Sequence, residues 1–201
     1  MKDMDNSKYI VPIFVDSILI GTGVLHNSLL ITVAHVIEFC RQGKFFDVFF
    51  RQNRYTLGWD KNLFFEYDEE KMGVYRDLAI FKTEIKTKGL SFESEKDHDA
   101  KIAAIFGYYD SNGSLMVNQS KGIISLKPYW DGVINIPINR NSFLLRDIPA
   151  LYECNSGCPL LLNGNVIGLV SAGNSDYKYF RLVSASHVLT VLSNLNILSY
   201  E

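Results

Sequence analysis

Three short segments of the chain carry side chains whose types could serve nucleophilic catalysis: a histidine, an aspartate and a serine. His35 lies near the end of the apolar run 29–36 (LLITVAHV), and Asp77 comes just before the apolar run 78–82 (LAIFK). Ser156 lies in a turn of small residues, C-N-S-G-C-P. Taken singly, each also has a structural interpretation, because histidines beside apolar strands are commonly hydrogen-bonded and Asp and Ser favour turns.

Together, these residue types would supply the parts of a hydrolytic site. A serine hydroxyl is a poor nucleophile near neutral pH, so an imidazole must accept its proton as attack proceeds. A buried carboxylate fixes the tautomer of the imidazole and stabilises the imidazolium that forms. Small residues around the serine let backbone N–H groups approach the developing oxyanion, and each such donor is worth about 3–4 kcal/mol.

The motifs around these residues, in their order along the chain, resemble those of the trypsin and chymotrypsin-like serine peptidases. T-V-A-H at 32–35 resembles the family's T-A-A-H, and R-D-L-A-I at 76–80 resembles D-[IL]-A-[LV]. C-N-S-G-C-P at 154–159 resembles G-D-S-G-G-P, and G-L-V-S-A-G at 168–173 resembles G-I-V-S-W-G. G-I-I-S at 122–125 is also similar to a landmark of the bacterial Do-like and glutamyl-endopeptidase branches.

This resemblance covers nearly the whole chain and implies a role for each residue. Ser156 would be the nucleophile, His35 the general base and Asp77 the residue that orients the histidine. The backbone N–H groups of Cys154 and Ser156 would form the oxyanion hole, and no metal or other cofactor is implied. The chain's other histidines are expected to be surface or capping residues: His26, His98 and His187.

The segment around the serine departs from the family pattern in ways that bear on activity. Cys154 stands where the family has glycine, which tolerates backbone geometries that a Cβ penalises. Two interpretations stay open: an oxyanion hole that forms when substrate binds, or a disabled hole. Asn155 replaces the aspartate that vertebrate-type zymogens pair with a freshly cut N-terminus, so activation by N-terminal cleavage is not expected.

Cys154 and Cys158 flank the candidate nucleophile and allow a redox hypothesis, in which oxidation of either thiol blocks the hole. The interpretation that we favour is that both are small buried thiols used in packing. With Cys40 they make an odd number and no disulfide framework, which favours a reducing compartment. The N-terminal MKDMDNSKYI lacks the apolar region of a secretory signal, so we expect a cytoplasmic location.

The resemblance also names the residues that would contact the substrate: Ala150, Leu151, Ser171, Ala172, Gly173 and Tyr177. Ala150 falls where trypsin-type enzymes place an acidic residue, so we expect a small or medium apolar side chain before the scissile bond. Asp176 leaves a basic side chain as the alternative. The stretch 171–173 would pair with the substrate backbone, so that the peptide binds extended, by β-addition.

The elements that must position these residues are predicted to be short β-strands. Runs of β-branched, aromatic and aliphatic residues bounded by Gly, Asn and Asp predict strands at 9–15, 17–25, 29–33, 45–50, 78–82, 101–106, 114–118, 122–126, 132–136, 159–162, 165–171 and 178–183. Such regular spacing predicts an all-β barrel or sandwich. The charged stretch 84–99 separates two series of strands and is the candidate connection between lobes.

The resemblance narrows this all-β prediction to two six-stranded β-barrels of the chymotrypsin type with a C-terminal α-helix. We place the first lobe, with His35 and Asp77, at residues 1–98 and the second, with Ser156, at 99–201. The site would form in the cleft between the lobes. Apolar residues at helical spacing predict the terminal helix over 184–199, capped by Ser184 or Ser186.

Composition indicates a soluble globular protein and argues against two classes of partner. Hydrophobic residues are 47% and charged residues 21% of the 201, near the average for a globular domain. A net charge of −2, without Lys/Arg clusters interleaved with aromatics, argues against nucleic acid as the main partner. No apolar run reaches the roughly 18 residues that span a bilayer, so no membrane segment is expected.

Two functions compete at this stage. The first is an active endopeptidase that processes a dedicated protein, beside a separate protein that presents the substrate or switches the protease on. The second is a non-enzymatic relative that keeps the fold as a peptide- or protein-binding module, with Cys154 marking a decayed oxyanion hole. The presence of His35, Asp77 and Ser156 together favours catalysis.

Overall fold

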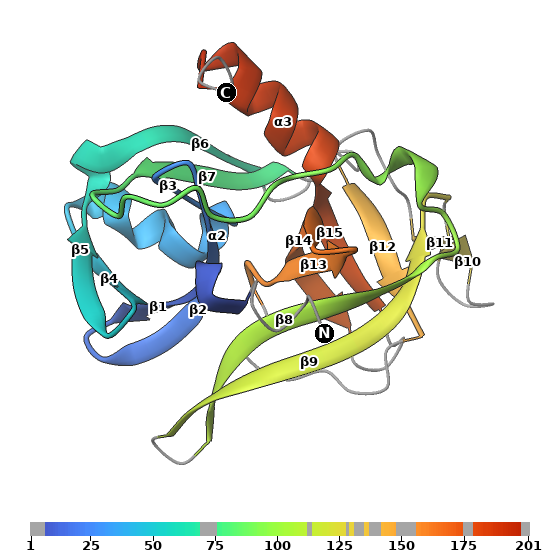
Figure 1. Cartoon of the computed structure of the whole chain (residues 1–201), viewed down its shortest axis with the longest axis horizontal. Coiled ribbons are helices and arrows are strands. Elements are labelled where there is room, and N and C mark those ends of the chain that lie inside the picture. The colour runs from blue at the N-terminus through green and yellow to red at the C-terminus, as the bar shows by residue number, and fades with distance from the viewer. Residues whose placement is uncertain are drawn as a thin grey trace.

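Two β-sheet lobes lie side by side in the computed structural model, and a C-terminal helix lies above them in the view of Figure 1. The structure describes residues 7–68, 76–111, 114–127, 129–130, 135–136, 142–147, 156–174 and 179–197. Across these ranges, none of the helices has the length and apolar character needed to cross a bilayer.

The first lobe is an antiparallel sheet with strand order β5-β4-β1-β2-β3-β7-β6. Its strands are β1 (Ile10–Val15), β2 (Ile18–His26), β3 (Leu29–Thr32), β4 (Phe46–Phe50), β5 (Asn53–Leu57), β6 (Asn62–Asp68) and β7 (Arg76–Lys82). The predicted barrel-like first lobe is confirmed, with a strand number that differs from the six expected. Seven strands form a half-barrel, and within the described residues the edge strands β5 and β6 do not pair with each other.

Four short helical segments accompany this lobe: η1 (Ser7–Tyr9), α2 (Ala34–Ile37), η2 (Glu38–Gln42) and η3 (Trp59–Lys61). A fifth, η4 (Glu95–Asp97), lies in the connection that follows the lobe. The core between the sheet faces is made of fully buried apolar side chains such as Val24, Leu30 and Ile80. Burial of this apolar surface is the main free-energy gain that holds the strands in register.

The second lobe is a closed six-stranded barrel in the order β12-β15-β14-β13-β8-β9, as predicted. Its strands are β8 (Ile102–Ser111), β9 (Ser114–Ser125), β12 (Ser142–Arg146), β13 (Pro159–Leu162), β14 (Asn165–Asn174) and β15 (Tyr179–Ser184). A separate pair, β10 (Tyr129–Trp130) and β11 (Asn135–Ile136), stands outside the barrel. Closure pairs every barrel strand on both sides over part of its length, which removes open sheet edges there.

Four strands were not predicted from the apolar runs: β5, β6, β12 and the two-residue β10. β5 (NRYTL) and β6 (NLFFEYD) are edge strands, where polar side chains face water without cost. β12 (SFLLR) has only three apolar residues in sequence, and its pairing with β9 and β15 supplies the rest of its stability. Tertiary pairing, rather than local propensity, makes these segments strands.

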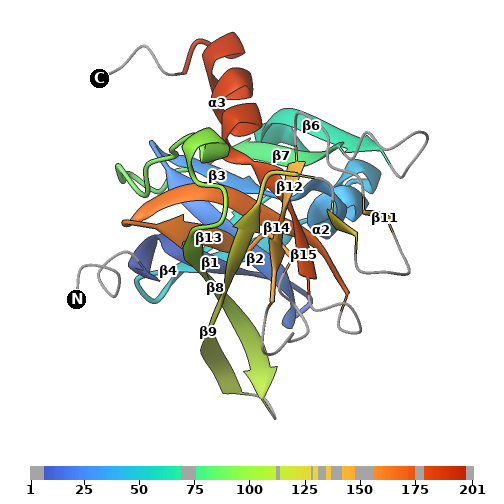
Figure 2. The ribbon, with the colours of Figure 1, turned by 90° about the vertical axis from the view of Figure 1, so that its right-hand side faces the viewer.

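β8 and β9 form a long two-stranded ribbon that extends beyond the barrel (Figure 1, Figure 2). We predicted separate strands at 114–118 and 122–126, but β9 runs unbroken through the polar stretch between them. Pairing with β8 satisfies the main chain of that stretch, so its polar side chains do not interrupt the strand.

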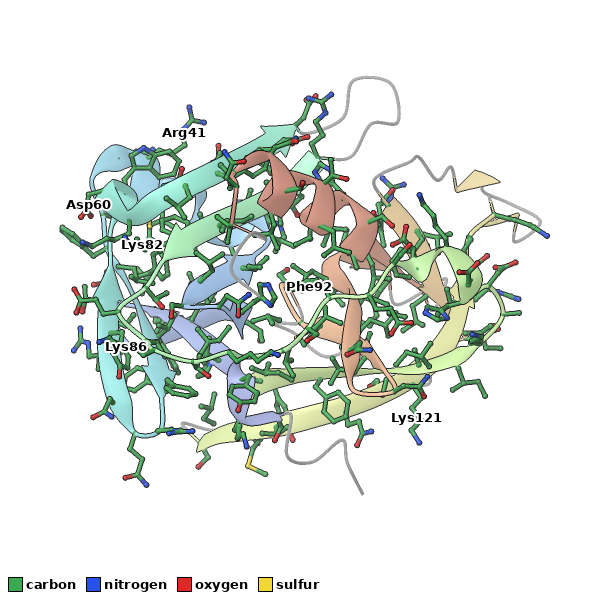
Figure 3. All side chains as sticks on the ribbon, turned by 45° about the horizontal axis from the view of Figure 1, so that its top comes forward. Arg41, Asp60, Lys82, Lys86, Phe92 and Lys121 are labelled. Carbon is green, nitrogen blue, oxygen red and sulfur yellow. The ribbon has the colours of Figure 1, made fainter. Side chains whose placement is uncertain are left out.

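The connecting stretch 84–99, predicted as the connection between the lobes, is docked on both of them. The N–H of Leu90 donates to the Leu25 carbonyl at 2.9 Å, on the first lobe. Three residues later, the N–H of Glu93 donates to the Val166 carbonyl at 2.9 Å, on the barrel. Figure 3 shows Phe92 midway along this path, and its ring packs edge-on against His26 with centroids 5.5 Å apart. The connection therefore ties the lobes together.

The histidines predicted to be surface or capping residues are largely buried, although His98 does stand at the C-cap of η4. His26 is 8% exposed, and its ring Nδ1–H donates to the Leu90 carbonyl at 2.7 Å. His98 is 6% exposed, and its Nε2 lies 3.1 Å from a carboxylate oxygen of Glu93. The other ring nitrogens also have partners, Asn27 Nδ2 at 3.2 Å from Nε2 of His26 and Lys101 Nζ at 2.9 Å from Nδ1 of His98. Burial is tolerated because each ring nitrogen that leaves water gains a hydrogen-bond partner.

Helix α3 (Ala185–Asn194) is shorter than the predicted helix 184–199. Ser184 is its N-cap, and its hydroxyl oxygen accepts a hydrogen bond from the His187 backbone N–H at 3.1 Å. The His187 ring is largely buried against the molecule. The helix ends at Asn194, and Asn196 adopts a left-handed backbone conformation (φ 56°), which ends a helix and which asparagine tolerates.

The docking of the connection predicts a difference between two glycine substitutions. Gly89 (φ 67°) and Gly43 (φ 81°) both have left-handed backbones, so alanine at either position costs about 1–2 kcal/mol of unfolding free energy. Only at Gly89 would a Cβ meet the Leu25 carbonyl oxygen, at 1.9 Å, whereas nothing lies within 4 Å at Gly43. Gly89→Ala is expected to lower the urea unfolding midpoint at least twice as far as Gly43→Ala. Equal losses would show that the connection is not held against β2.

Candidate active site

His35 lies in the first turn of α2, directly after strand β3. β3 pairs with β7 in the register Thr32↔Ala79, which brings the start of α2 beside Asp77. The His35 backbone N–H donates to Oδ1 of Asp77 at 2.9 Å, and the ring Nδ1 lies 2.7 Å from Oδ2. Asp77 therefore holds both the main chain and the ring of this histidine.

The Asp77 carboxylate is fully buried and accepts a third hydrogen bond from the barrel. Its Oδ2 accepts from the hydroxyl of Ser171, on β14, as well as from the ring of His35. A desolvated carboxylate requires such donors, since an unpaired buried charge is costly. Because a carboxylate only accepts, Nδ1 of His35 carries the proton, and the neutral ring keeps a lone pair on Nε2.

Ser156 comes from the second lobe and completes the chain of hydrogen bonds. Its Oγ lies 2.8 Å from Nε2 of His35, so the hydroxyl donates to the free lone pair of the ring. The side chain of His35 is 29% exposed, and Ser156 is half-buried, so the pair is accessible from solvent. This geometry allows the hydroxyl proton to pass to the imidazole without further rearrangement.

The turn after Ser156 is pressed against β2 of the first lobe. The Thr22 backbone N–H donates to the Ser156 carbonyl at 2.9 Å. Gly157 has a φ of +81°, and a Cβ there would lie 1.9 Å from the Thr22 carbonyl oxygen. Its N–H donates to the Val170 carbonyl at 2.7 Å, which ties the turn to β14. Glycine is therefore required at 157 for both conformation and space.

Thr22 is a buried junction between the lobes that sequence reasoning did not single out. Its carbonyl accepts a hydrogen bond from the Thr32 hydroxyl at 2.7 Å, and its own hydroxyl oxygen lies 3.5 Å from the Cys158 sulfur. The flanking glycine Gly21 makes this approach possible, because a Cβ there would stand 3.0 Å from the Ser156 carbonyl oxygen. The G-T-G pattern was the available signal for this contact.

Ser171 also has a contact that was not predicted. It was assigned to the substrate-binding strand through its backbone, whereas its side chain bonds Asp77. Ser171, Ala172 and Gly173 lie in β14. Ala172 and Gly173 pair with Arg181 and Phe180 of β15, and Ser171 lies at the bulge between Val170 and Ala172. On the other side, pairing with β13 ends at Leu169, so within the described residues this stretch has a strand neighbour on one side only.

Several residues of the predicted site lie outside the described residues: Ala150, Leu151, Cys154, Asn155, Asp176 and Tyr177. Their roles in the oxyanion hole and the specificity pocket stay predictions. The catalytic roles of His35, Asp77 and Ser156 also stay predictions, although the structure brings the three side chains together. Among the residues that the structure describes, no three His, Cys, Asp or Glu side chains gather to hold a metal ion.

Two of the three cysteines are described, Cys40 and Cys158, and both are buried thiols that form no disulfide. Cys158 is fully buried, and a Cβ on the neighbouring Gly107 would lie 1.9 Å from its sulfur. Cys158 thus fills the space between the barrel and Thr22, as expected for a packing residue. Burial raises the pKa of the Cys40 thiol to about 12.

Solved structures share this fold at low sequence identity. No family model matches the sequence, and no curated protein matches it. A Glu endopeptidase matches with a TM-score of 0.66 at 16% identity, over 96% of this chain and 94% of that chain. The HtrA-type protease AlgW with a decapeptide matches at 0.61 and 18% identity, over 88% of this chain and 51% of that chain. An inactivated protease paralogue of the scabies mite, S-D1, matches at 0.70 and 14% identity, over 96% of this chain and 93% of that chain.

These comparisons establish the fold. The chain has the two-lobed chymotrypsin-like fold of trypsin-like serine proteases, and its structural neighbours include an HtrA-type protease and a Glu endopeptidase, the two branches whose motifs it resembles. An inactivated paralogue has the same fold, so the decision between catalysis and binding depends on the site rather than the scaffold.

The burial of the thiols predicts low reactivity in the native protein. With a pKa of about 12, roughly one Cys40 thiol in ten thousand is ionised at pH 8, and the thiolate is the reactive form. Iodoacetamide at pH 8 should therefore leave Cys40 and the buried Cys158 unmodified in the native state, measured by peptide mass spectrometry. Denaturing urea is the control and should expose both. Rapid modification of Cys158 in the native protein would show that its thiol is accessible and would support the redox hypothesis.

Proposed function

We propose that this protein is a serine endopeptidase that cleaves peptide bonds through an acyl-enzyme. The observation that carries the proposal is the hydrogen-bonded chain from Asp77 through His35 to Ser156, built across two lobes of the serine-protease fold. Its geometry has an oriented base within reach of a hydroxyl, which is the arrangement that activates serine.

In the proposed reaction, Oγ of Ser156 attacks the substrate carbonyl while its proton moves to Nε2 of His35. The resulting imidazolium is stabilised by Asp77, whose carboxylate is held by backbone and hydroxyl donors and stays unprotonated. The tetrahedral intermediate collapses, the amine leaves with the proton from Nε2, and the acyl group remains on Oγ. Water, deprotonated by the same imidazole, then releases the acid product and regenerates Ser156.

The proposed oxyanion hole uses the backbone N–H groups of Ser156 and Cys154. The N–H of Gly157 is not available, because it already donates to the Val170 carbonyl. Cys154 replaces the family's glycine, so its geometry decides whether the hole is preformed or completed by the substrate.

The proposed substrate is an extended segment of a protein. In the part of the chain that the structure describes, the stretch Ser171–Gly173 has a strand neighbour on one side only, and an added strand would satisfy its outer backbone groups. AlgW, which shares the fold, was solved with a decapeptide. We extend the proposal to a small or medium apolar residue before the scissile bond, a cytoplasmic location and a dedicated substrate, with a separate protein to present it or to activate the protease.

The second candidate function is a catalytically impaired module that binds peptides or proteins. Two observations favour it: Cys154 at the oxyanion-hole position, and the similarity to an inactivated paralogue. It needs the same peptide-binding edge of β14 but no reactive serine.

Labelling with a fluorophosphonate probe separates the two functions. The endopeptidase proposal expects the wild-type protein to be labelled at Ser156, and Ser156→Ala to lose labelling and at least about four orders of magnitude in peptide hydrolysis. Ser193→Ala, an exposed serine on α3, is the matched control and should behave as wild type. An unlabelled wild-type protein, with candidate partners present, would support the binding module.

Asp77→Asn tests the orienting carboxylate. An asparagine amide can donate to Nδ1, which leaves the imidazole proton on Nε2, where the ring cannot accept from Ser156. We expect kcat for peptide hydrolysis to fall by about 10⁴. Asp47→Asn is the control, since Asp47 is a buried acid of the same lobe whose partner is Arg54 at 2.7 Å. A loss smaller than tenfold in Asp77→Asn would argue that another group orients His35.

A further inference from the structure

A groove of about 600 Å³ follows β6, the edge strand of the first lobe. Seven consecutive residues, 62–68, line it from both faces of the strand, and Arg41, Trp59 and Arg76 complete it. β6 pairs with β7 on one side, and no strand among the described residues covers its other side. The groove therefore follows an open strand edge, where a further extended segment has room to lie.

One end of this groove lies beside the candidate active site. Tyr67 pairs in register with Asp77, across β6 and β7. The ring of Tyr67 also lies beside the ring of His35, with centroids 6.5 Å apart. A polypeptide that occupies the cleft at His35 can therefore continue into the groove without leaving the surface of the first lobe.

Aromatic side chains line the groove farther from His35. Phe65 lies on the same face of β6 as Tyr67, two residues earlier, and its ring packs against Trp59 with centroids 5.2 Å apart. Trp59 is 36% exposed, although its ring also contacts the buried Phe81, which fixes its position. These rings offer a preformed apolar surface to a partner.

Beside Phe65, the groove carries a cation without a carboxylate partner among the described residues, Arg41. The guanidinium of Arg41 lies 5.4 Å from the centroid of the Phe65 ring, and Figure 3 shows Arg41 pointing outward from the lobe. The groove's other arginine, Arg76, is paired with Glu66 at 3.0 Å. A polypeptide bound in the groove would therefore be electrostatically complementary if it placed an acidic side chain beside Arg41.

We propose that this groove is an exosite for the protein substrate of the endopeptidase, an inference that rests on the proposed function. It binds an extended substrate segment, with an apolar or aromatic side chain against Trp59 and Phe65 and an Asp or Glu side chain on Arg41. The path from His35 to Arg41 has three steps: 6.5 Å from the His35 ring to the Tyr67 ring, about 7 Å along the strand to Phe65, and 5.4 Å from the Phe65 ring to Arg41. Its length is therefore about 19 Å. At about 3.3 Å per residue, the acidic side chain lies about six residues from the scissile bond.

The experiment profiles cleavage of a library of long proteome-derived peptides by the full-length protein, with mass spectrometry of the new termini. In wild type, we expect Asp and Glu to be enriched about threefold at four to eight residues from the scissile bond, on one side. This magnitude follows from a surface ion pair, which is worth roughly two- to fivefold in affinity. Arg41→Gln should abolish the enrichment, and Arg41→Glu should replace it with Lys and Arg.

Arg51→Glu is the matched control, because Arg51 is also an exposed arginine stacked on an aromatic ring, 5.0 Å from Phe50, and does not line the groove. It should keep the acidic preference. Enrichment is compared within each variant, so differences in overall rate do not affect it. The exosite alone would be overturned if the protein is labelled by the fluorophosphonate probe and cleaves peptides but shows no preference for Asp or Glu. It would also be overturned if Arg41→Glu leaves that preference unchanged. Absence of both labelling and cleavage would overturn the endopeptidase, and the exosite with it.

Discussion

The fully buried carboxylate of Asp77 is the constraint around which the two lobes are arranged. A charge removed from water must be matched by donors, and Asp77 takes them from the main chain and ring of His35 and from the Ser171 hydroxyl. The first two belong to the first lobe and the third to the barrel. The same interaction that satisfies the carboxylate thus orients an imidazole and joins β7 to β14.

A second contact, made by backbone groups, fixes the turn that carries Ser156. Thr22 donates to the Ser156 carbonyl, and Gly157 approaches so closely that no side chain fits between them. Cys158 fills the space behind this junction. The distance between the imidazole and the hydroxyl is therefore set by β2 as much as by the residues that react. Packing of this kind holds side chains to the fraction of an ångström that proton transfer requires.

Open strand edges give the site its means of holding a polypeptide. Among the described residues, no strand pairs with the outer side of Ser171–Gly173 or with the edge of β6 along the groove that ends beside His35. Extended peptides bind such edges through main-chain hydrogen bonds, which do not depend on the peptide's side chains. Selectivity among peptides must therefore come from side-chain contacts. In this protein the aromatic rings beside Arg41 are suited to that task.

Short apolar runs and the motifs around His35, Asp77 and Ser156 are local signals, and from them the sequence predicted the fold class, the barrel of the second lobe, a terminal helix and the three candidate side chains. It did not determine β5, β6 and β12, whose polar residues are tolerated only because neighbouring strands pair with them. Nor did it predict that His26 and His98 are buried, since their partners lie in the docked connection. The contacts of Thr22 with Ser156, and of Ser171 with Asp77, join residues more than ninety positions apart. Only the tertiary structure decides such pairs, because the free energy of a buried hydrogen bond depends on which partner the fold brings to it.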